Sequence, residues 1–141
     1  EHVFVGYRNR PETTRAVLVD GWLHTGDLAH TDENGLYYLH GRRDDVINCA
    51  GRKFAPADVE NCILQLNEVQ EAAVVAAPHP TLGQVAKAYV VLKPGIVLNA
   101  RSITRHCARN LPSHKVPFYV EFTAALPRNS TGKVLHRKLS A

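Results

Sequence analysis

The stretch GRRDDVINCAGRKFAPADVE, residues 41–60, changes from a charged segment to an apolar hairpin pattern and then to a helix start. Its first part, Gly41–Asp45, begins with glycine and is highly charged, which is typical of a flexible boundary. The strand-like segments on either side of Ala50-Gly51 predict a small hairpin formed by Val46–Cys49 and Lys53–Phe54. The stretch therefore predicts a boundary followed by the beginning of a compact domain.

The residues from Pro56 onward mix helix and strand patterns. Pro56 is suited to the first turn of a helix, where its missing N–H costs nothing, and we interpret Asp58 and Glu60 as helix-start residues and not as general acids or bases. The helix face is formed by Val59, Cys62, Ile63 and Leu66. Further expected elements are strands at Glu71–Ala77 and Ala86–Leu92, a helix capped by Asn99 and ended before Pro112, a strand at Tyr119–Phe122 and a short helix from about Val134. We predict an α+β fold, with a small three-stranded sheet, flanking helices and a β-hairpin.

The residues before position 41 carry mainly strand signals. A short helix is expected at Glu12–Val19, followed by strand character on both sides of Gly26. Asn34-Gly35 is a strong hairpin signal, and Leu36–Leu39 is expected to be the returning strand. This part of the chain is therefore predicted to be a β-rich piece.

The composition is that of an ordinary soluble domain, with 141 residues, 45% hydrophobic and 21% charged. No apolar run approaches the length of a membrane span. The net charge of +4 is spread along the chain, and its one dense basic cluster, residues 136–138, lacks the aromatic side chains that stack nucleic-acid bases. We therefore expect no membrane span and no nucleic-acid partner. Because the sequence has no methionine, we expect Glu1 to follow a processing step or to lie inside a longer chain.

The three cysteines, Cys49, Cys62 and Cys107, are too few and too widely spaced for a disulfide framework or a CxxC site. We expect them to be reduced and at least partly buried, which indicates a reducing compartment and a cytoplasmic location. The eight histidines form no HExxH motif, and the adjacent pair His106-Cys107 is a poor pair of metal ligands. The sequence therefore predicts no metal site.

The stretch PRNSTGKVLHRKL, Pro127–Leu139, places Gly132 beside Lys133 in a polar loop. A P-loop needs a glycine where this chain has Pro127 and a hydroxyl residue where it has Val134, so a P-loop is excluded. A lysine in a glycine-bearing turn still suits an anionic ligand, because glycine permits close backbone approach and lysine is a mobile point charge. From this loop alone, a solvated turn is the favoured interpretation.

Three stretches taken together, GWLHTGDLA, GRRDDVINCAGRKFAPADVE and LPRNSTGKVLHRKL, resemble in order and spacing the C-terminal portion of the adenylate-forming superfamily. That superfamily includes acyl-CoA synthetases, the adenylation domains of peptide synthetases and firefly luciferase. The resemblance implies that residues 1–40 are the end of a large N-terminal domain, that residues 41–46 are a hinge and that residues 47–141 are a mobile C-terminal domain. It also implies a reaction of a carboxylic acid with ATP, followed by displacement of AMP by a thiol.

The resemblance assigns roles to individual residues. Asp27 resembles the carboxylate that accepts the two ribose hydroxyls, and Arg42 resembles the arginine near the ribose and phosphate of the nucleotide. Asp44 resembles the hinge residue, whose backbone torsions absorb the rotation. Gly51 resembles the glycine lining the pantetheine tunnel, where a missing side chain leaves room for the thiol arm. Lys133 matches the catalytic lysine, which contacts the substrate carboxylate and the α-phosphate.

The implied activity is that of an ATP-dependent acid–thiol ligase of the acyl-CoA synthetase type. The cofactors are ATP, Mg²⁺ held mainly by the missing N-terminal domain, and the thiol of CoA or phosphopantetheine. The partners are the protein's own N-terminal domain, a carboxylic acid, and CoA or an acyl carrier protein. Two alternatives stay open: an enzyme that loads a carrier protein or forms AMP esters without CoA, and a non-catalytic module that binds a carrier or partner. The chain on its own is expected to be inactive.

Overall fold

The computed structural model describes residues 4–140. The chain divides into two compact units, Glu1–Asp44 and Asp45–Ala141. The second unit contains a five-stranded sheet with the strand order β6-β5-β8-β7, in which β9 also pairs with β8. Its strands are β5 (Ile47–Cys49), β6 (Arg52–Phe54), β7 (Val69–His79), β8 (Gly83–Leu92) and β9 (Tyr119–Phe122). The pairs are antiparallel except for β8 with β9, which is parallel.

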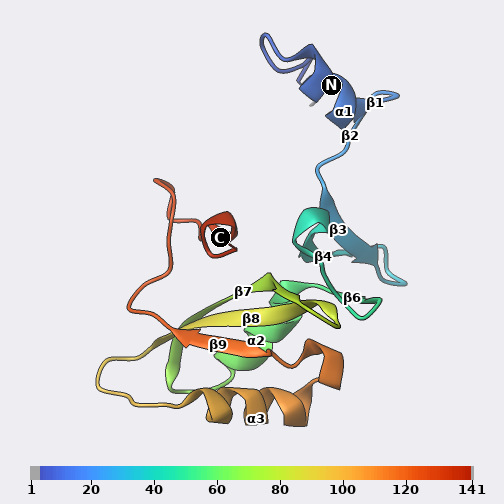
Figure 1. Cartoon of the computed structure of the whole chain (residues 1–141). Helices are drawn as coiled ribbons and strands as arrows, with labels where there is room; N and C mark the ends of the chain where they lie inside the picture. The colour runs from blue at the N-terminus through green and yellow to red at the C-terminus, as the bar shows by residue number, and fades with distance from the viewer. Residues whose placement is uncertain (1–3, 141) are drawn as a thin grey trace. The chain divides into compact units, whose positions relative to one another are not determined.

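The two faces of this sheet are covered by different kinds of structure (Figure 1). Helices α2 (Pro56–Leu64) and α3 (Ala100–Asn110) cover one face, and their buried side chains pack with Val74, Ala88 and Val90 of the long strands. The opposite face carries a smaller cluster of Ala73, Val75, Tyr89, Val91 and Leu126, against which Val134 and Leu139 pack. The C-terminal segment, which ends in the 3-10 helix η3 (His136–Lys138), therefore forms the second cover of the sheet.

The two helices form where the sequence predicts them. Helix α2 begins at Pro56, and its buried positions Val59, Cys62 and Ile63 follow the helical spacing. Helix α3 is capped by Asn99, whose Oδ1 accepts a hydrogen bond from the backbone N–H of Ser102 at 2.9 Å. A second 3-10 helix, η2 (Ser113–Lys115), follows α3.

The predicted α+β class is confirmed, but the predicted three-stranded sheet is too small. The hairpin of β5 and β6, expected as a separate element, joins the sheet because Cys49 pairs with Gly83 at the start of β8. The backbone N–H of Ala50 also donates to the carbonyl of Leu82 at 2.9 Å. One pair of residues is enough to join the hairpin to the hydrogen-bonded ladder, and no pattern of side chains in the sequence predicts this pairing.

Strands β7 and β8 are also longer than predicted. Their ladder runs from Val69↔Leu92 to His79↔Gly83, so Pro78 and His79, expected in a loop, lie in a strand. The proline is tolerated because β7 is an edge strand and a missing N–H on its free side breaks no ladder bond.

The first unit contains helix α1 (Pro11–Val17) and two small antiparallel sheets. The strands are β1 (Leu18–Val19), β2 (Trp22–Leu23), β3 (Asp27–Thr31) and β4 (Tyr37–Arg42). Strand β4 runs through Gly41 and Arg42, where the sequence predicted a flexible boundary, and the 3-10 helix η1 (Arg43–Asp45) follows it. None of the described residues 4–44 is buried, and Trp22, Tyr37 and Leu39 are 76%, 79% and 76% exposed. This unit therefore has no core of its own in the described residues.

The turn between β5 and β6 carries a strained residue. Ala50 and Gly51 have φ angles of 49° and 83°, the left-handed pair of a two-residue hairpin turn, in which Asn-Gly is strongly preferred. The left-handed region costs an alanine roughly 1–2 kcal/mol. We expect Ala50→Asn to raise the free energy of unfolding of the chain by about 1 kcal/mol, measured by urea denaturation followed by far-UV circular dichroism.

The matched control is Gly51→Ala, which places a β-carbon at a left-handed position and should lower the free energy of unfolding by a similar amount. Loss of stability in Ala50→Asn would show that the turn does not have this geometry in solution.

Candidate functional site

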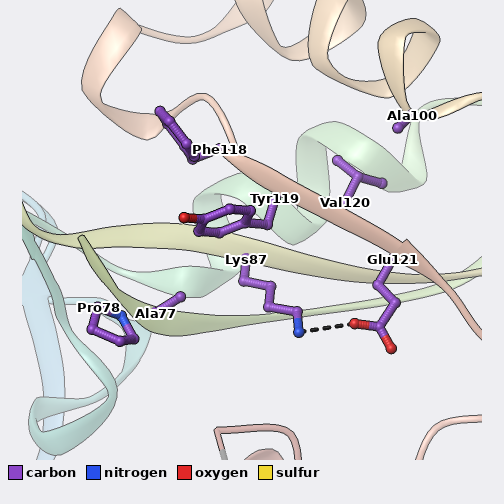
Figure 2. Close-up of a pocket in the computed structure, with 8 residues that line it drawn as sticks. All are labelled: Ala77, Pro78, Lys87, Ala100, Phe118, Tyr119, Val120 and Glu121. Atoms are coloured by element: carbon purple, nitrogen blue, oxygen red, sulfur yellow. Dashed lines mark ion pairs between the residues drawn. The ribbon is translucent and has the colours of Figure 1, made fainter. Parts of the chain in front are cut away.

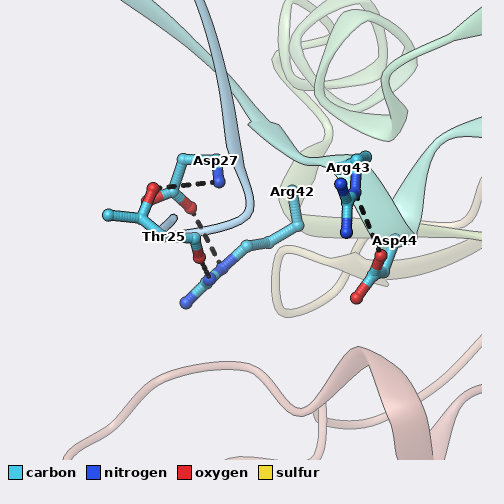
Figure 3. A network of polar contacts seen from close by, with 5 residues as sticks. All are labelled: Thr25, Asp27, Arg42, Arg43 and Asp44. Carbon is cyan, nitrogen blue, oxygen red and sulfur yellow. Dashed lines mark hydrogen bonds and ion pairs between the residues drawn. The ribbon is translucent and has the colours of Figure 1, made fainter. Parts of the chain in front are cut away.

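Asp27 and Arg42 form a pair at the start of the β3–β4 ladder, where the two residues are register partners (Figure 3). The Arg42 Nε lies 3.1 Å from the Asp27 Oδ1, and the Arg42 Nη1 donates to the carbonyl oxygen of Thr25. The backbone N–H of Asp27 donates to the Thr25 Oγ1 at 3.1 Å. Arg42 thus holds the Thr25-Gly26-Asp27 turn, and the family resemblance assigns Arg42 and Asp27 to the same nucleotide.

This pair opens onto a cavity of about 520 Å³ within the first unit. The lining residues are Ala16, Val17, Val19, Leu23, His24, Thr25, Gly26, Asp27, Arg42, Arg43 and Asp44. Among the described residues, the Asp27 Oδ2 accepts no hydrogen bond, while the Oδ1 faces Arg42. A free carboxylate oxygen beside a guanidinium can accept from a hydroxyl and attract an anion, which are the two features of a sugar phosphate.

Asp44 also lines this cavity and is the last residue of the first unit. Its one ion-pair partner among residues 4–140 is the neighbouring Arg43, with 3.8 Å between the Arg43 Nε and the Asp44 Oδ1, and both side chains are largely exposed (Figure 3). Such a pair contributes little to stability. The backbone N–H of Arg43 donates to the carbonyl oxygen of Gly26 at 2.8 Å, which fixes the chain up to this point.

Lys133 lies in the second unit, on a loop organised by Asn129. The Asn129 Oδ1 accepts from the backbone N–H groups of Thr131 and Lys133, at 3.0 and 2.8 Å, and from the Thr131 hydroxyl. Gly132, with a φ of 84°, lets the chain turn before the lysine. The Lys133 side chain is exposed, and between residues 4 and 140 it makes no hydrogen bond or ion pair. The loop therefore presents a free ammonium group on a tightly folded backbone.

The loop is tied to the sheet on both sides. Before it, Arg128 forms an ion pair with Glu71 of β7, with 2.5 Å between the Nη2 and the Oε2. After it, the His136 Nε2 lies 3.1 Å from the Glu60 Oε1. That same Glu60 oxygen accepts the backbone N–H of Val74 at 2.8 Å, on the free edge of β7.

Gly51 lies in the β5–β6 turn, and a β-carbon built there would meet no atom within 4 Å. The side of this residue is therefore open within the second unit. The turn is anchored by Cys49 at the first residue of β8, whereas Glu71, which anchors the lysine loop, pairs with Val91 near the other end of β8. At about 3.3 Å per residue, these two anchor points are on the order of 26 Å apart.

The structure thus brings Asp27, Arg42 and Asp44 together in the first unit and separates Gly51 from Lys133 within the second. Sequence reasoning missed Arg128, Asn129 and the bridging role of Glu60. An asparagine two residues before Thr131 is a recognised turn signal, so Asn129 was open to prediction. The two ion-pair partners come from positions far away in the sequence, and no local pattern reveals them.

A larger hollow of about 650 Å³ lies beside β8 and β9 and contains none of the predicted site residues (Figure 2). Its cation, Lys87, forms an ion pair with Glu121 at 2.8 Å and lies over the Tyr89 ring. Because the carboxylate already neutralises the ammonium group, this hollow is a poor anion site.

The predicted state of the cysteines is confirmed, since Cys49, Cys62 and Cys107 are all free and buried. Burial, together with the neighbouring Cys62, raises the pKa of the Cys107 thiol to about 12, so this thiol is inert at neutral pH. Within residues 4–140 no three metal-binding side chains cluster. None of the described helices has the length and apolar character to cross a membrane.

The family model, the similar sequences and the similar structures agree with one another. The family model of the AMP-binding enzyme C-terminal domain matches residues 58–133. The chain is 39% identical over 137 residues to the long-chain-fatty-acid–CoA ligase of Bacillus subtilis, covering 97% of this chain and 24% of that protein.

Two solved structures are similar over nearly the whole chain. ATP-bound MatB from Rhodopseudomonas palustris has a TM-score of 0.92 at 33% identity, covering 97% of this chain and 27% of that one. The o-succinylbenzoate CoA synthetase from Bacillus subtilis, in complex with its acyl-adenylate intermediate, has a TM-score of 0.90 at 35% identity, covering 99% and 28%. The chain spans about a quarter of the length of these proteins.

The His136–Glu60 contact predicts a pH-dependent stability. The hydrogen bond with Glu60 raises the pKa of His136 above its ordinary value of 6.5; burial and the charge of Lys133 oppose this, and Asp45 supports it. Because the folded-state pKa is raised, the stabilisation is fully present below pH 6.5 and is lost as the pH rises through the folded value.

We expect the free energy of unfolding to fall more between pH 6 and pH 8.5 in the wild type than in His136→Gln, by up to about 1 kcal/mol. Urea denaturation at several pH values measures this difference, with the exposed His24→Gln as control. Equal pH dependence in His136→Gln and the wild type would contradict the assigned contact.

Proposed function

Because the chain belongs to the AMP-binding enzyme C-terminal domain family, we propose that the intact protein is an ATP-dependent carboxylic acid–thiol ligase. The single observation that carries this proposal is Lys133, an exposed ammonium group without a protein partner in the described residues, on a loop whose backbone is fixed by Asn129. A cation presented in this way fits a reaction in which two anions, a carboxylate and a phosphate, must be brought together.

The first step is adenylation. A carboxylate oxygen of the acid attacks the α-phosphorus of ATP, the bond to the bridging oxygen breaks, and pyrophosphate leaves with the electron pair. Lys133 neutralises the charge of the two reacting anions and stabilises the transition state. Asp27 accepts the ribose hydroxyls through its free oxygen, and Arg42 holds the carboxylate while facing the phosphate side of the nucleotide.

The second step is thioester formation. The thiolate sulfur attacks the acyl carbon, the bond from this carbon to the phosphate oxygen breaks, and AMP leaves. We propose that Gly51 lines the entry of the pantetheine arm, which is supported by the open space around this residue. Mg²⁺ would accompany ATP in the first step and would be held mainly by residues outside this chain.

The two steps use different surfaces of residues 47–141, which we propose to be the mobile domain, with residues 41–46 as the hinge and Asp44 as its pivot. Residues 1–40 would then be the end of a larger N-terminal domain. The exposed Trp22, Tyr37 and Leu39 support this view, because a unit of this size without a core needs further structure to cover its apolar side chains.

We propose CoA as the thiol, since the long-chain-fatty-acid–CoA ligase and the o-succinylbenzoate CoA synthetase are both CoA-dependent by name, and a cytoplasmic location, since the three cysteines are free and buried. The acids named for these relatives, a long-chain fatty acid and o-succinylbenzoate, differ in size and shape. The acid used here is therefore a question for a substrate panel.

We expect Lys133→Ala in the intact protein to reduce carboxylate-dependent ATP–pyrophosphate exchange by about 10²–10³-fold. The loss of thioester formation from supplied acyl-adenylate should be much smaller, because the second step does not use the lysine. A panel of fatty, aryl and amino acids identifies the substrate class in the same assay. Lys138→Ala, which removes a neighbouring exposed cation, is the control.

Equal losses in both half-reactions would contradict the role of Lys133. No exchange by the wild type with any acid would favour the non-catalytic module. Exchange followed by transfer to a carrier protein but not to CoA, or by no transfer at all, would favour one of the two alternatives within the enzyme class.

We also expect the isolated chain of residues 1–141 to have no ligase activity. The family's ATP phosphate loop and acid pocket would lie in the remaining three quarters of the protein. The measurement is turnover of acid, ATP and CoA by the purified chain under conditions in which the intact protein is active. Turnover by the chain alone would refute this expectation.

A further inference from the structure

We propose that Arg128 is a positioning residue for the adenylation step, which it serves by fixing the peptide group that precedes Lys133. This inference rests on the proposed function, because it concerns the placement of the lysine in that reaction. Arg128 acts through Lys133 and does not itself contact the substrate.

The guanidinium group of Arg128 makes two different contacts. Its Nη2 forms an ion pair with the Glu71 Oε2, and its Nη1 donates to the carbonyl oxygen of Gly132, each at 2.5 Å. The planar fork of arginine presents two donors in a fixed relation, so one side chain connects the loop backbone to strand β7. A lysine at this position offers a single nitrogen and cannot reproduce that geometry.

The carbonyl of Gly132 belongs to the same peptide plane as the N–H of Lys133. Arg128 holds the oxygen end of this plane, and the Asn129 Oδ1 holds the nitrogen end at 2.8 Å. Gly132 lies in the left-handed region at a φ of 84°, and glycine has access to more backbone conformations than any other residue. Without the arginine contact the plane is held at one end only and is freer to rotate about the glycine.

Glu71 connects this arrangement to the rigid part of the fold. It lies in β7 and pairs with Val91 of β8, next to the apolar cluster on the face of the sheet that the C-terminal segment covers. The backbone at Lys133 is thereby held in a fixed orientation relative to the sheet, and not only relative to the rest of its loop. Catalytic groups that are misplaced by about 1 Å can lose on the order of 10²-fold in rate.

The Arg128–Glu71 pair contributes little to folding by itself. The two side chains are 44% and 31% exposed, and pairs of this kind typically contribute less than about 1 kcal/mol. The fold is held by the apolar side chains on both faces of the sheet, including Leu126 and Val134 on either side of the loop. Removal of the fork is therefore expected to alter the loop while the domain stays folded.

The test uses the intact protein with Arg128→Lys, which keeps the charge and loses the fork. We expect ATP–pyrophosphate exchange to show a kcat lowered by about 10-fold to 10²-fold and a KM for ATP within about 3-fold of the wild type. Thioester formation from supplied acyl-adenylate should stay within about 3-fold, and the Tm should stay within about 2 °C. Arg109→Lys, a substitution of an exposed arginine on α3, is the matched control.

A second variant separates the fork from the ion pair. The charge reversal Glu71→Arg with Arg128→Glu restores the ion pair, but a carboxylate at position 128 cannot donate to the carbonyl of Gly132. We expect exchange by this double variant to stay as slow as exchange by Arg128→Lys. Recovery toward the wild-type rate would overturn the proposed role of the fork.

The outcomes distinguish this inference from the proposed function. If the wild type exchanges, Lys133→Ala does not, and Arg128→Lys exchanges at the wild-type rate, only the inference on Arg128 fails. Equal losses in both half-reactions of Arg128→Lys, or a large fall in Tm, would show a structural role and overturn it as well. If Lys133→Ala exchanges normally or the wild type does not exchange, the proposed function fails and the inference fails with it.

Discussion

Burial of both faces of the β7–β8 pair is the constraint on which the rest of the second unit depends. Within the described residues of the second unit, helices cover one face and the C-terminal segment covers the other through Leu126, Val134 and Leu139. Full burial of a side chain such as Leu126 contributes roughly 1.5–3 kcal/mol, and the half-buried Val134 and Leu139 contribute less, so the chain is held at Leu126 and again from Val134 onward. The intervening loop with Lys133 must therefore emerge at a fixed place on the sheet. A requirement of packing thus determines where the candidate catalytic residue lies.

The internal bonding of this loop explains how it differs from a P-loop. In a P-loop, backbone N–H groups point at the phosphate and cradle it. Here the N–H groups of Thr131 and Lys133 donate to the side chain of Asn129, and the N–H of Gly132 donates to the carbonyl of Asn129. These backbone N–H groups are thus already hydrogen-bonded within the loop, and the donor that remains available to an anion is the ammonium group of Lys133. Such an arrangement suits a group that enters and leaves a reaction centre, because only one side chain, and not several backbone N–H groups, must then lose its water.

Local patterns were sufficient to predict the types of the main elements, because Pro56, Asn99 and the apolar spacing of α2 and α3 act within one or two turns of a helix. They were insufficient for contacts between distant residues. The pairing of Cys49 with Gly83 enlarges the sheet, and Arg128 meets Glu71 across a long interval of sequence. The roles of Asp27, Arg42, Asp44, Gly51 and Lys133 came from the order of three motifs, since each residue alone looks like part of a turn or a solvated surface. The structure adds the neighbours through which these roles can be tested.

The placement of the Gly51 turn and the lysine loop at opposite ends of β8 has a mechanistic consequence under the proposed function. Both must serve one acyl-adenylate, Lys133 while it forms and Gly51 while the thiol attacks it. Their anchor points are on the order of 26 Å apart on a single rigid sheet, and side-chain rotations cover only a few ångströms. Neither loop can reach the reaction centre of the other by local motion. Under the proposed function we therefore expect the domain to rotate as a body between the two steps. Because each step would use its own end of the sheet, we expect substitutions at one end to impair one half-reaction and spare the other.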